Sequence, residues 1–176
     1  PSTVDNNITI NNCHMIGDIS GGGSAGIIGG KSGGPLGKTT AIISECSMIG
    51  NISGPYCAGI IGDGFAGGDW GGDYPVNTIL DICNCTYEGI ISGQDAAGIF
   101  GISSISAYAE ASIRYCDASA TIYASDSTGI GGCGFTGGTI LGCGFTGDIY
   151  GESSSGICKG GWSNIISCTS EGNLYG

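Results

Sequence analysis

A motif of 20 residues recurs along the chain and limits the possible folds more than any other feature. Its clearest copy, at residues 43–62, has the sequence ISECSMIGNISGPYCAGIIG. The shared pattern is Ile-x-x-Cys-x-x-x-Gly-x-Ile-x-Gly-x-x-x-Ala-Gly-Ile-x-Gly, and its cysteine occurs at Cys13, Cys46, Cys85, Cys116, Cys143 and Cys168. Five copies contain the whole frame, and a sixth stops at Gly176. Such self-similarity predicts an array of stacked units rather than a globule.

The copies differ in length at only one point of the repeat. Consecutive frame cysteines are 33, 39, 31, 27 and 25 residues apart, around a constant core of 22 residues. We therefore expect one repeat array over residues 1–176, with insertion loops at a single corner. The expected rung cores are 8–29, 41–62, 80–101, 111–132, 138–159 and 163–176, and the longest insertion loop is 63–79.

Three sets of isoleucines occupy fixed places in the repeat. β-Branched residues at such places, separated by Gly-rich turns, favour short strands over helices. The sequence therefore predicts an all-β parallel β-solenoid of about six three-strand rungs, with these isoleucines stacked into structural ladders. The ladder residues are Ile10, Ile43, Ile82, Ile113, Ile140 and Ile165, then Ile19, Ile52, Ile91, Ile122 and Ile149, and finally Ile27, Ile60, Ile99, Ile130 and Ile157.

The composition excludes several classes of function. The chain has 4 basic and 15 acidic residues, with a net charge of −11, whereas nucleic-acid binding requires clustered Lys and Arg. Its apolar runs are far too short for a membrane span. We expect no cofactor.

The six frame cysteines form a fourth column, which predicts an inward ladder of small buried side chains. Oxidation is an alternative, because neighbouring rungs would place their Cα atoms about 4.8 Å apart. The cysteines outside the frame, which are better candidates for bridges, are Cys57, Cys83, Cys133 and Cys158. Their spacing does not favour zinc.

Two columns are expected to face outward and to offer contact surfaces. The first is free of side chains and is flanked by apolar residues, so it suits assembly with another molecule: Gly26, Gly59, Gly98, Gly129 and Gly156, followed by Ile28, Ile61 and Phe100. Alternatively, insertion loops containing Phe65, Trp70 and Tyr74 cover it. The second column, Tyr123, Tyr150 and Tyr175, predicts either aromatic stacking or a contact strip for sugars or a neighbouring molecule.

The segment from Gly67 to Asp73 places two carboxylates on Gly-rich turns. Carboxylates in such turns can bind calcium, but their spacing here does not match an EF-hand or a nonapeptide calcium repeat. Calcium is therefore a weak expectation.

The motif itself resembles a known repeat. The pattern Cys-x-x-x-Gly-x-Ile-Ser-Gly followed by Ala-Gly-Ile-Ile-Gly, at 13–29 and 46–62, resembles the GLUG repeats of bacterial surface proteins. Similar repeats occur in large DNA viruses. The resemblance implies a β-solenoid in a surface or structural protein, extracellular or on a cell or virion surface, with no catalytic residues to transfer.

Three functions remain open on these grounds. The favoured one is a structural or adhesive segment of a surface, fibre or filament protein, which self-associates end to end or side by side and contacts a glycan or host surface. A carbohydrate-binding or carbohydrate-active β-helix is the alternative, although an enzyme would need carboxylates and bases that converge in a groove. An ice-binding solenoid is the third, but no outer column is Thr throughout.

Overall fold

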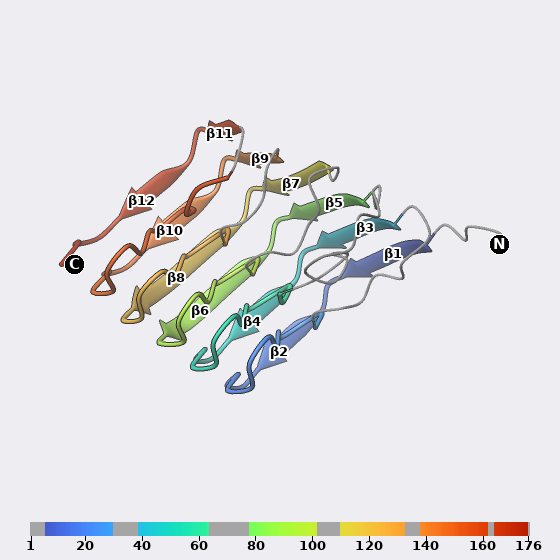
Figure 1. Ribbon diagram of the computed structural model, residues 1–176. Helices are drawn as coiled ribbons and strands as arrows, with labels where there is room; N and C mark the ends of the chain where they lie inside the picture. The colour runs from blue at the N-terminus through green and yellow to red at the C-terminus, as the bar shows by residue number, and fades with distance from the viewer. Residues whose placement is uncertain are drawn as a thin grey trace, which may run out of the picture.

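The computed structural model describes residues 6–29, 39–63, 78–101, 110–132, 138–161 and 164–175. These residues form two parallel sheets of six strands each, and every rung contributes one strand to each sheet (Figure 1). The predicted all-β parallel solenoid is therefore confirmed. The described residues contain no helix that could cross a membrane.

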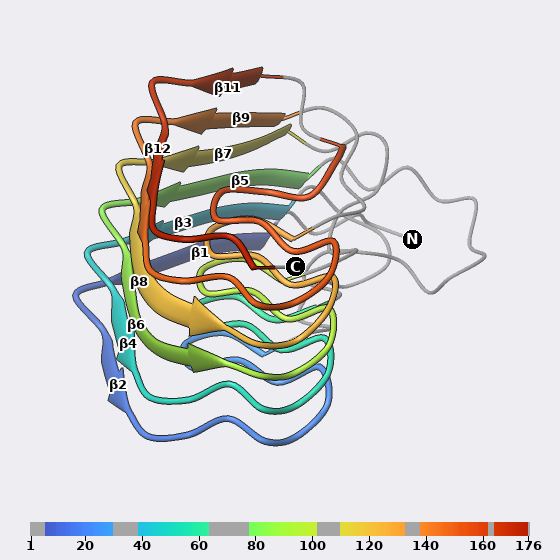
Figure 2. The same cartoon turned by 90° about the vertical axis from the view of Figure 1, so that its left-hand side faces the viewer.

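The first sheet has the order β1-β3-β5-β7-β9-β11, and the second has the order β12-β10-β8-β6-β4-β2. Figure 2 shows the first sheet across the top and the second down the left side. The strands of the first sheet are β1 (Asn6–Asn11), β3 (Thr39–Ser44), β5 (Thr78–Cys83), β7 (Glu110–Arg114), β9 (Gly138–Leu141) and β11 (Asn164–Ile166). Those of the second are β2 (His14–Ile16), β4 (Ser47–Ile49), β6 (Thr86–Ile91), β8 (Asp117–Ile122), β10 (Gly144–Thr146) and β12 (Thr169–Glu171).

The third side of each rung differs from the expected strand, because isolated parallel bridges replace a sheet. One row of bridges runs from Ala25 to Ser155, and a second runs from Ile28 to Cys158. The backbone bends sharply just before these bridges, where the residues at Gly23, Tyr56 and their counterparts have positive φ. Each rung therefore has two strands and a third side joined by isolated bridges, where the sequence predicted a third strand.

The core is made from residues that stack on like residues. The register pairs Ile43 with Ile82 and Ile82 with Ile113 in the first isoleucine ladder. In the second isoleucine ladder, a bridge joins Ile52 to Ile91. All these side chains are fully buried. Burial contributes about 1.5–3 kcal/mol for each such side chain, so the ladders supply much of the stability.

Turns at two corners use left-handed backbone conformations. The residue before each frame cysteine has φ of 53–63°, in the row Asn12, Glu45, Asn84, Tyr115, Gly142 and Ser167. A second such row, with φ of 55–69°, is Gly23, Tyr56, Asp95, Asp126 and Ser153. Most members are not glycine, so the contacts that follow each turn must offset a cost of about 1–2 kcal/mol per residue.

Candidate functional site

The frame cysteines lie immediately after the first left-handed turn and point into the rod. Cys46, Cys85, Cys116 and Cys143 are buried, whereas Cys168 is half-buried and Cys13 is exposed. Each thiol donates to the carbonyl two residues earlier, as Cys46 does to Ser44 at 3.2 Å. From Cys85 onward the thiol also approaches a carbonyl of the preceding rung, as Cys143 does to Ile113 at 3.6 Å. The thiol ladder therefore closes a turn and bridges two rungs.

The environment shifts the pKa values of these buried thiols in opposite directions. Burial raises the pKa of the Cys46 thiol above its ordinary value. Contact with the thiols of Cys143 and Cys85, together with burial, raises the pKa of Cys116. Hydrogen bonding with the Cys116 thiol lowers the pKa of Cys85 and of Cys143. All four side chains are 0–1% exposed and bond to backbone carbonyls, so they act as packing and hydrogen-bonding groups.

All nine cysteines among the described residues are free. Three of the four suggested bridge candidates, Cys57, Cys83 and Cys158, are therefore not bridged, and Cys133 lies outside the described residues. Cys57 also has a place in the repeat that the sequence analysis missed. It follows the second left-handed turn, and the residues at its position are Ser24, Cys57, Ala96, Ser127 and Ser154. That alternation of Ser, Cys and Ala, eleven residues after each frame cysteine, was the available signal.

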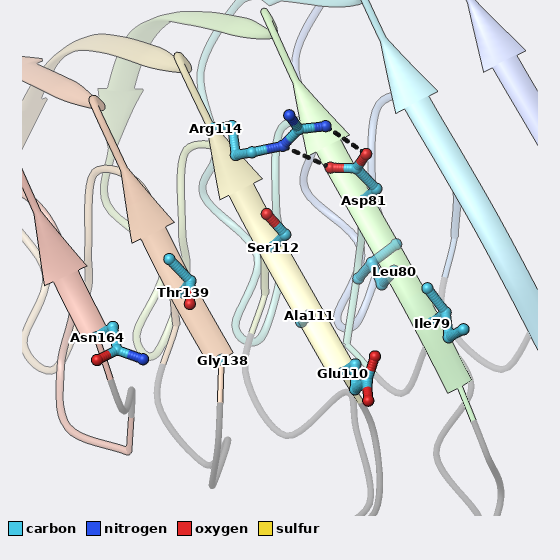
Figure 3. Close-up of a pocket in the computed structure, with 10 residues that line it drawn as sticks. All are labelled: Ile79, Leu80, Asp81, Glu110, Ala111, Ser112, Arg114, Gly138, Thr139 and Asn164. Carbon is cyan, nitrogen blue, oxygen red and sulfur yellow. Dashed lines mark hydrogen bonds and ion pairs between the residues drawn. The ribbon is translucent and has the colours of Figure 1, made fainter.

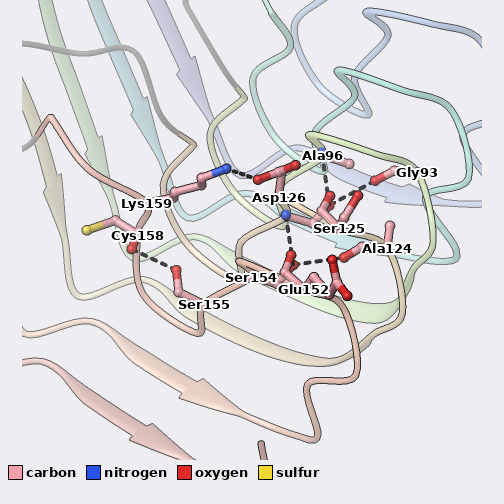
Figure 4. Close-up of polar contacts among 11 residues, drawn as sticks. Gly93, Ala96, Ala124, Ser125, Asp126, Glu152, Ser154, Ser155, Cys158 and Lys159 are labelled. Atoms are coloured by element: carbon pink, nitrogen blue, oxygen red, sulfur yellow. Dashed lines mark hydrogen bonds and ion pairs between the residues drawn. The ribbon is translucent and has the colours of Figure 1, made fainter. Parts of the chain in front are cut away.

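This column, here called the second polar column after that of the frame cysteines, links several rungs to the rung before them, and Figure 4 shows the part of it around Ser154. The Ser154 hydroxyl donates to Ala124 O at 2.8 Å and accepts from Ser127 N at 3.0 Å. Ser127 Oγ likewise donates to Gly93 O at 2.9 Å, and the Cys57 thiol donates to Gly21 O at 2.6 Å. An ion pair between Lys159 and Asp126 lies beside the column. Cys57, Ser127 and Ser154 thus each satisfy a backbone carbonyl of the preceding rung, whereas Ala96 has no side-chain donor.

The expected outward position of the Gly column is wrong. A Cβ at Gly59 would lie 2.1 Å from Gly98 O and 2.9 Å from the Tyr87 ring, which is itself buried. Gly98 and Gly129 are similarly crowded by Tyr87 and Phe145. Large side chains from the second sheet fill the interior here, so only glycine fits beneath them. The full set that lies inside or at the buried side is Gly26, Gly59, Gly98, Gly129 and Gly156.

The apolar residues after that column are also interior. Ile28 is 8% exposed, Ile61 0% and Phe100 1%, and all three belong to the main core cluster. They therefore cannot form the assembly surface that the sequence suggested. The alternative was that insertion loops containing Phe65, Trp70 and Tyr74 cover the Gly column, and these three residues lie outside the described residues. The candidate calcium site from Gly67 to Asp73 also lies outside them.

The tyrosine column is exposed and stacked. The rings of Tyr123 and Tyr150 have centroids 5.1 Å apart, and those of Tyr150 and Tyr175 are 4.5 Å apart and nearly parallel. Each inner ring face is thus covered by another ring, so the column presents edges and hydroxyls to solvent. A sugar would stack on ring faces, and the column therefore favours stabilisation of the rod over sugar binding.

The outer face of the first sheet carries a hollow of about 680 Å³ (Figure 3). At one end of the hollow is a bidentate ion pair, in which Arg114 Nε donates to Asp81 Oδ1 at 3.0 Å and Nη2 donates to Oδ2 at 2.5 Å. Hydrogen bonding to Asp81 raises the pKa of Arg114. The other polar groups that line it are Glu110, Ser112, Thr139 and Asn164. The hollow joins one cation, two carboxylates, two hydroxyls and an amide, which suits a neutral polyhydroxyl ligand better than a phosphate.

Metal ligands do not gather in the part of the chain that the structure describes. No group of three His, Cys, Asp or Glu side chains there could hold an ion. The one histidine, His14, bonds instead to Ser47 and Asn12 on the outer surface.

The end rungs expose members of ladders that are buried elsewhere. Ile165 is 52% exposed and Leu174 70%, whereas Ile113 and Ile122 in the middle rungs are 0% exposed. The ladder members Ile10, Ile27 and Ile157 are partly buried, and Ile19 and Ile149 are buried at 5% and 6%. Each sheet also ends in a strand with one neighbour, β1 and β11 in the first and β2 and β12 in the second. The two ends therefore present both apolar side chains and strand edges.

Comparison with known proteins adds no assignment: no family model, curated protein or solved structure matches the chain.

Proposed function

We propose that the chain is a structural β-solenoid that extends by end-to-end stacking into a fibre or filament and carries no catalysis of its own. The observation that carries this proposal is the in-register stacking of the rungs, in which each inner strand pairs with a strand of the rung on either side. Strand edges of this kind are templates for pairing with a further rung, whether it belongs to the same chain or to another copy. The motif's resemblance to GLUG repeats favours a cell or virion surface as the place where this rod works.

The proposal can be tested by weakening the end faces. We expect electron microscopy and light scattering to show filaments that lengthen with protein concentration. The double variant Ile165→Lys/Leu174→Lys should reduce filament mass at least tenfold, because two charges would be buried without partners at each junction. Added salt should promote stacking of the unmodified chain, since it screens the net charge of −11.

A matched control is Ile42→Lys/Ile90→Lys. Both residues are 41% exposed and lie along the rod, away from its ends. This variant should form filaments as the unmodified chain does. Dispersed monomers of the unmodified chain at every concentration, or equal loss in both variants, would contradict end-to-end stacking.

The hollow on the first sheet supports carbohydrate binding as a second function. Its Asp81–Arg114 pair is half-buried, with side-chain exposures of 28% and 38%, and hydroxyl and amide groups of the next rungs continue from it. Titration calorimetry with neutral oligosaccharides should therefore give a binding heat that Arg114→Gln abolishes. Asp117→Asn, an exposed change on the second sheet, should leave that heat unchanged. An unaltered heat in Arg114→Gln would place any binding elsewhere.

A further inference from the structure

Four buried frame cysteines stack on one another inside the rod. The residue after each frame cysteine donates its backbone N–H to the frame cysteine of the rung before, as Asp117 N does to Cys85 O at 3.0 Å. The cysteines are therefore in register, and the interval between neighbours is that of adjacent parallel strands, about 4.8 Å. The four members, here called the thiol line, are 0–1% exposed: Cys46, Cys85, Cys116 and Cys143.

The thiols of this line contact one another directly. Cys85 makes hydrogen-bonding contacts with the thiols of Cys46 and Cys116, and Cys116 makes a further contact with that of Cys143. The Cys116 sulfur also accepts from the backbone N–H of Cys85 at 3.4 Å, so it reaches the preceding rung. Sulfur atoms from four consecutive rungs thus follow one another along the rod, with one interval between each pair of neighbours.

The length of these intervals matches that of a linear complex of one metal ion with two thiolates. A metal–thiolate bond is about 2.3 Å long, so two such bonds in line span about 4.6 Å. The strand interval is close to this length, at about 4.8 Å. Thiolates are soft ligands that suit copper(I), an ion that accepts two sulfur atoms in line. Such an ion needs only two ligands, so the lack of any group of three His, Cys, Asp or Glu ligands among the described residues does not exclude it.

We propose that the thiol line is a binding site for soft monovalent metal ions such as copper(I), with one ion in each interval and with Cys85 and Cys116 each shared between two ions. Each ion forms two bonds to sulfur and replaces one thiol proton, which is released to solvent. One sulfur of the line keeps its proton, so the charge of the interior does not change, and nothing is oxidised or reduced. The bound ions would join four rungs. This inference does not depend on end-to-end stacking.

The burial of the thiol line determines how the ions enter. These thiols are closed to solvent in the folded rod, so we expect loading while the chain folds, and an ion held inside should resist a chelator in solution. Cys57 provides an internal comparison. It is also 0% exposed, but its neighbours in the second polar column are Ser24 and Ala96, so no second sulfur adjoins it there. This single buried thiol should therefore retain no metal.

The experiment uses the 176-residue chain with Cys13→Ser/Cys168→Ser, which removes the two frame thiols outside the line. The reduced chain is refolded without oxygen in the presence of copper(I), supplied as its acetonitrile complex, and accessible copper is then removed with excess bicinchoninate. We expect about three copper ions per chain to remain, one for each interval. Adding Cys143→Ser removes one interval and should leave about two ions, whereas adding Cys116→Ser removes two intervals and should leave about one. Cys57→Ser is the matched control and should leave the full number.

The unequal losses from Cys143→Ser and Cys116→Ser distinguish a shared line from separate thiols. Loss of the same number of ions from both variants would show that each thiol holds its own ion, and would overturn the proposal. Complete removal of copper by bicinchoninate would also overturn it. X-ray absorption spectroscopy of the loaded parent chain tests the site without a further substitution. Two sulfur ligands per ion are expected, and a third ligand, or any nitrogen or oxygen ligand, would contradict the linear complex.

Discussion

Two neighbouring residues on the third side of the rod show how the environment of one hydroxyl decides its effect. Ser127 and Thr128 are both buried, at 0% and 1% exposure. The Ser127 hydroxyl donates to Gly93 O and accepts from Ala96 N, whereas Thr128 Oγ1 has no hydrogen-bond partner among the described residues. Alanine occupies the position of Thr128 in three other rungs, at Ala25, Ala58 and Ala97. The Thr128 hydroxyl is therefore a destabilising group that the ladder tolerates.

We expect Thr128→Val to raise the free energy of unfolding by about 1 kcal/mol, because it removes a buried unpaired hydroxyl and keeps the shape of the side chain. Ser127→Ala is the matched change on the adjacent residue and should lower it by about 1–3 kcal/mol, since it leaves the Gly93 carbonyl and the Ala96 amide without their partner. Denaturant unfolding measures both. A loss of stability in Thr128→Val would show that its hydroxyl is satisfied in solution.

At the scale of the element, the turn is the unit that is stabilised, at one corner by the frame cysteines and at the other by the second polar column. Each left-handed residue except Asp95, which precedes Ala96, is followed by a small donor, a frame cysteine at one corner and Ser or Cys at the other. That donor bonds the carbonyl two residues back and, in most rungs, a carbonyl of the preceding rung as well. Thiol and hydroxyl are interchangeable in this role at neutral pH, but only the thiol titrates near physiological conditions.

This difference predicts a dependence on pH. Burial raises the pKa of Cys57 above the ordinary value of 9.0. The unfolded thiol therefore loses its proton first, and the stability that Cys57 contributes is complete below about pH 9 and is lost as the pH rises through its folded pKa. Cys57→Ser should change stability little at pH 7, because Ser127 and Ser154 fill the same position, and should flatten the alkaline decline measured by urea unfolding at several pH values.

The reciprocal change Ser127→Cys is the control, since it adds one buried thiol to the same column. It should make the alkaline decline steeper. Identical pH dependence in the two variants would contradict the assignment of this titration to the second polar column.

At the scale of the whole molecule, the strands of each rung contact the strands of the neighbouring rungs in sequence order. Strand β5 lies between β3 and β7, and the same relation holds for every inner strand. Stability is then approximately a sum of rung and interface terms, as in other repeat proteins. The end rungs lack one interface each, which is why Ile165 and Leu174 are exposed while equivalent residues in the middle are fully buried.

The repeat was sufficient to predict the parallel solenoid and its vertical register, because like residues occupy the same position in every copy. It could not predict which way the Gly column faces. A run of Gly, Ile and Ile offers no contrast between polar and apolar residues, and the answer depends on Tyr87 and Phe145, which reach across from the other sheet. The Asp81–Arg114 pair was also missed, since these residues occupy different rows of the repeat and meet diagonally across β5 and β7.

The in-register contact between rungs also bears on how such a molecule changes during evolution. A duplicated copy of the motif would meet, in the rungs on both sides of it, the same isoleucine, cysteine and backbone surfaces that its neighbours already present. After a deletion, the two rungs that become neighbours would present these surfaces to each other. Recombination between copies in the gene can therefore lengthen or shorten the rod by whole rungs and keep the isoleucine and cysteine ladders continuous. The length of the rod, rather than the shape of its cross-section, is the property that selection can adjust most easily in this architecture.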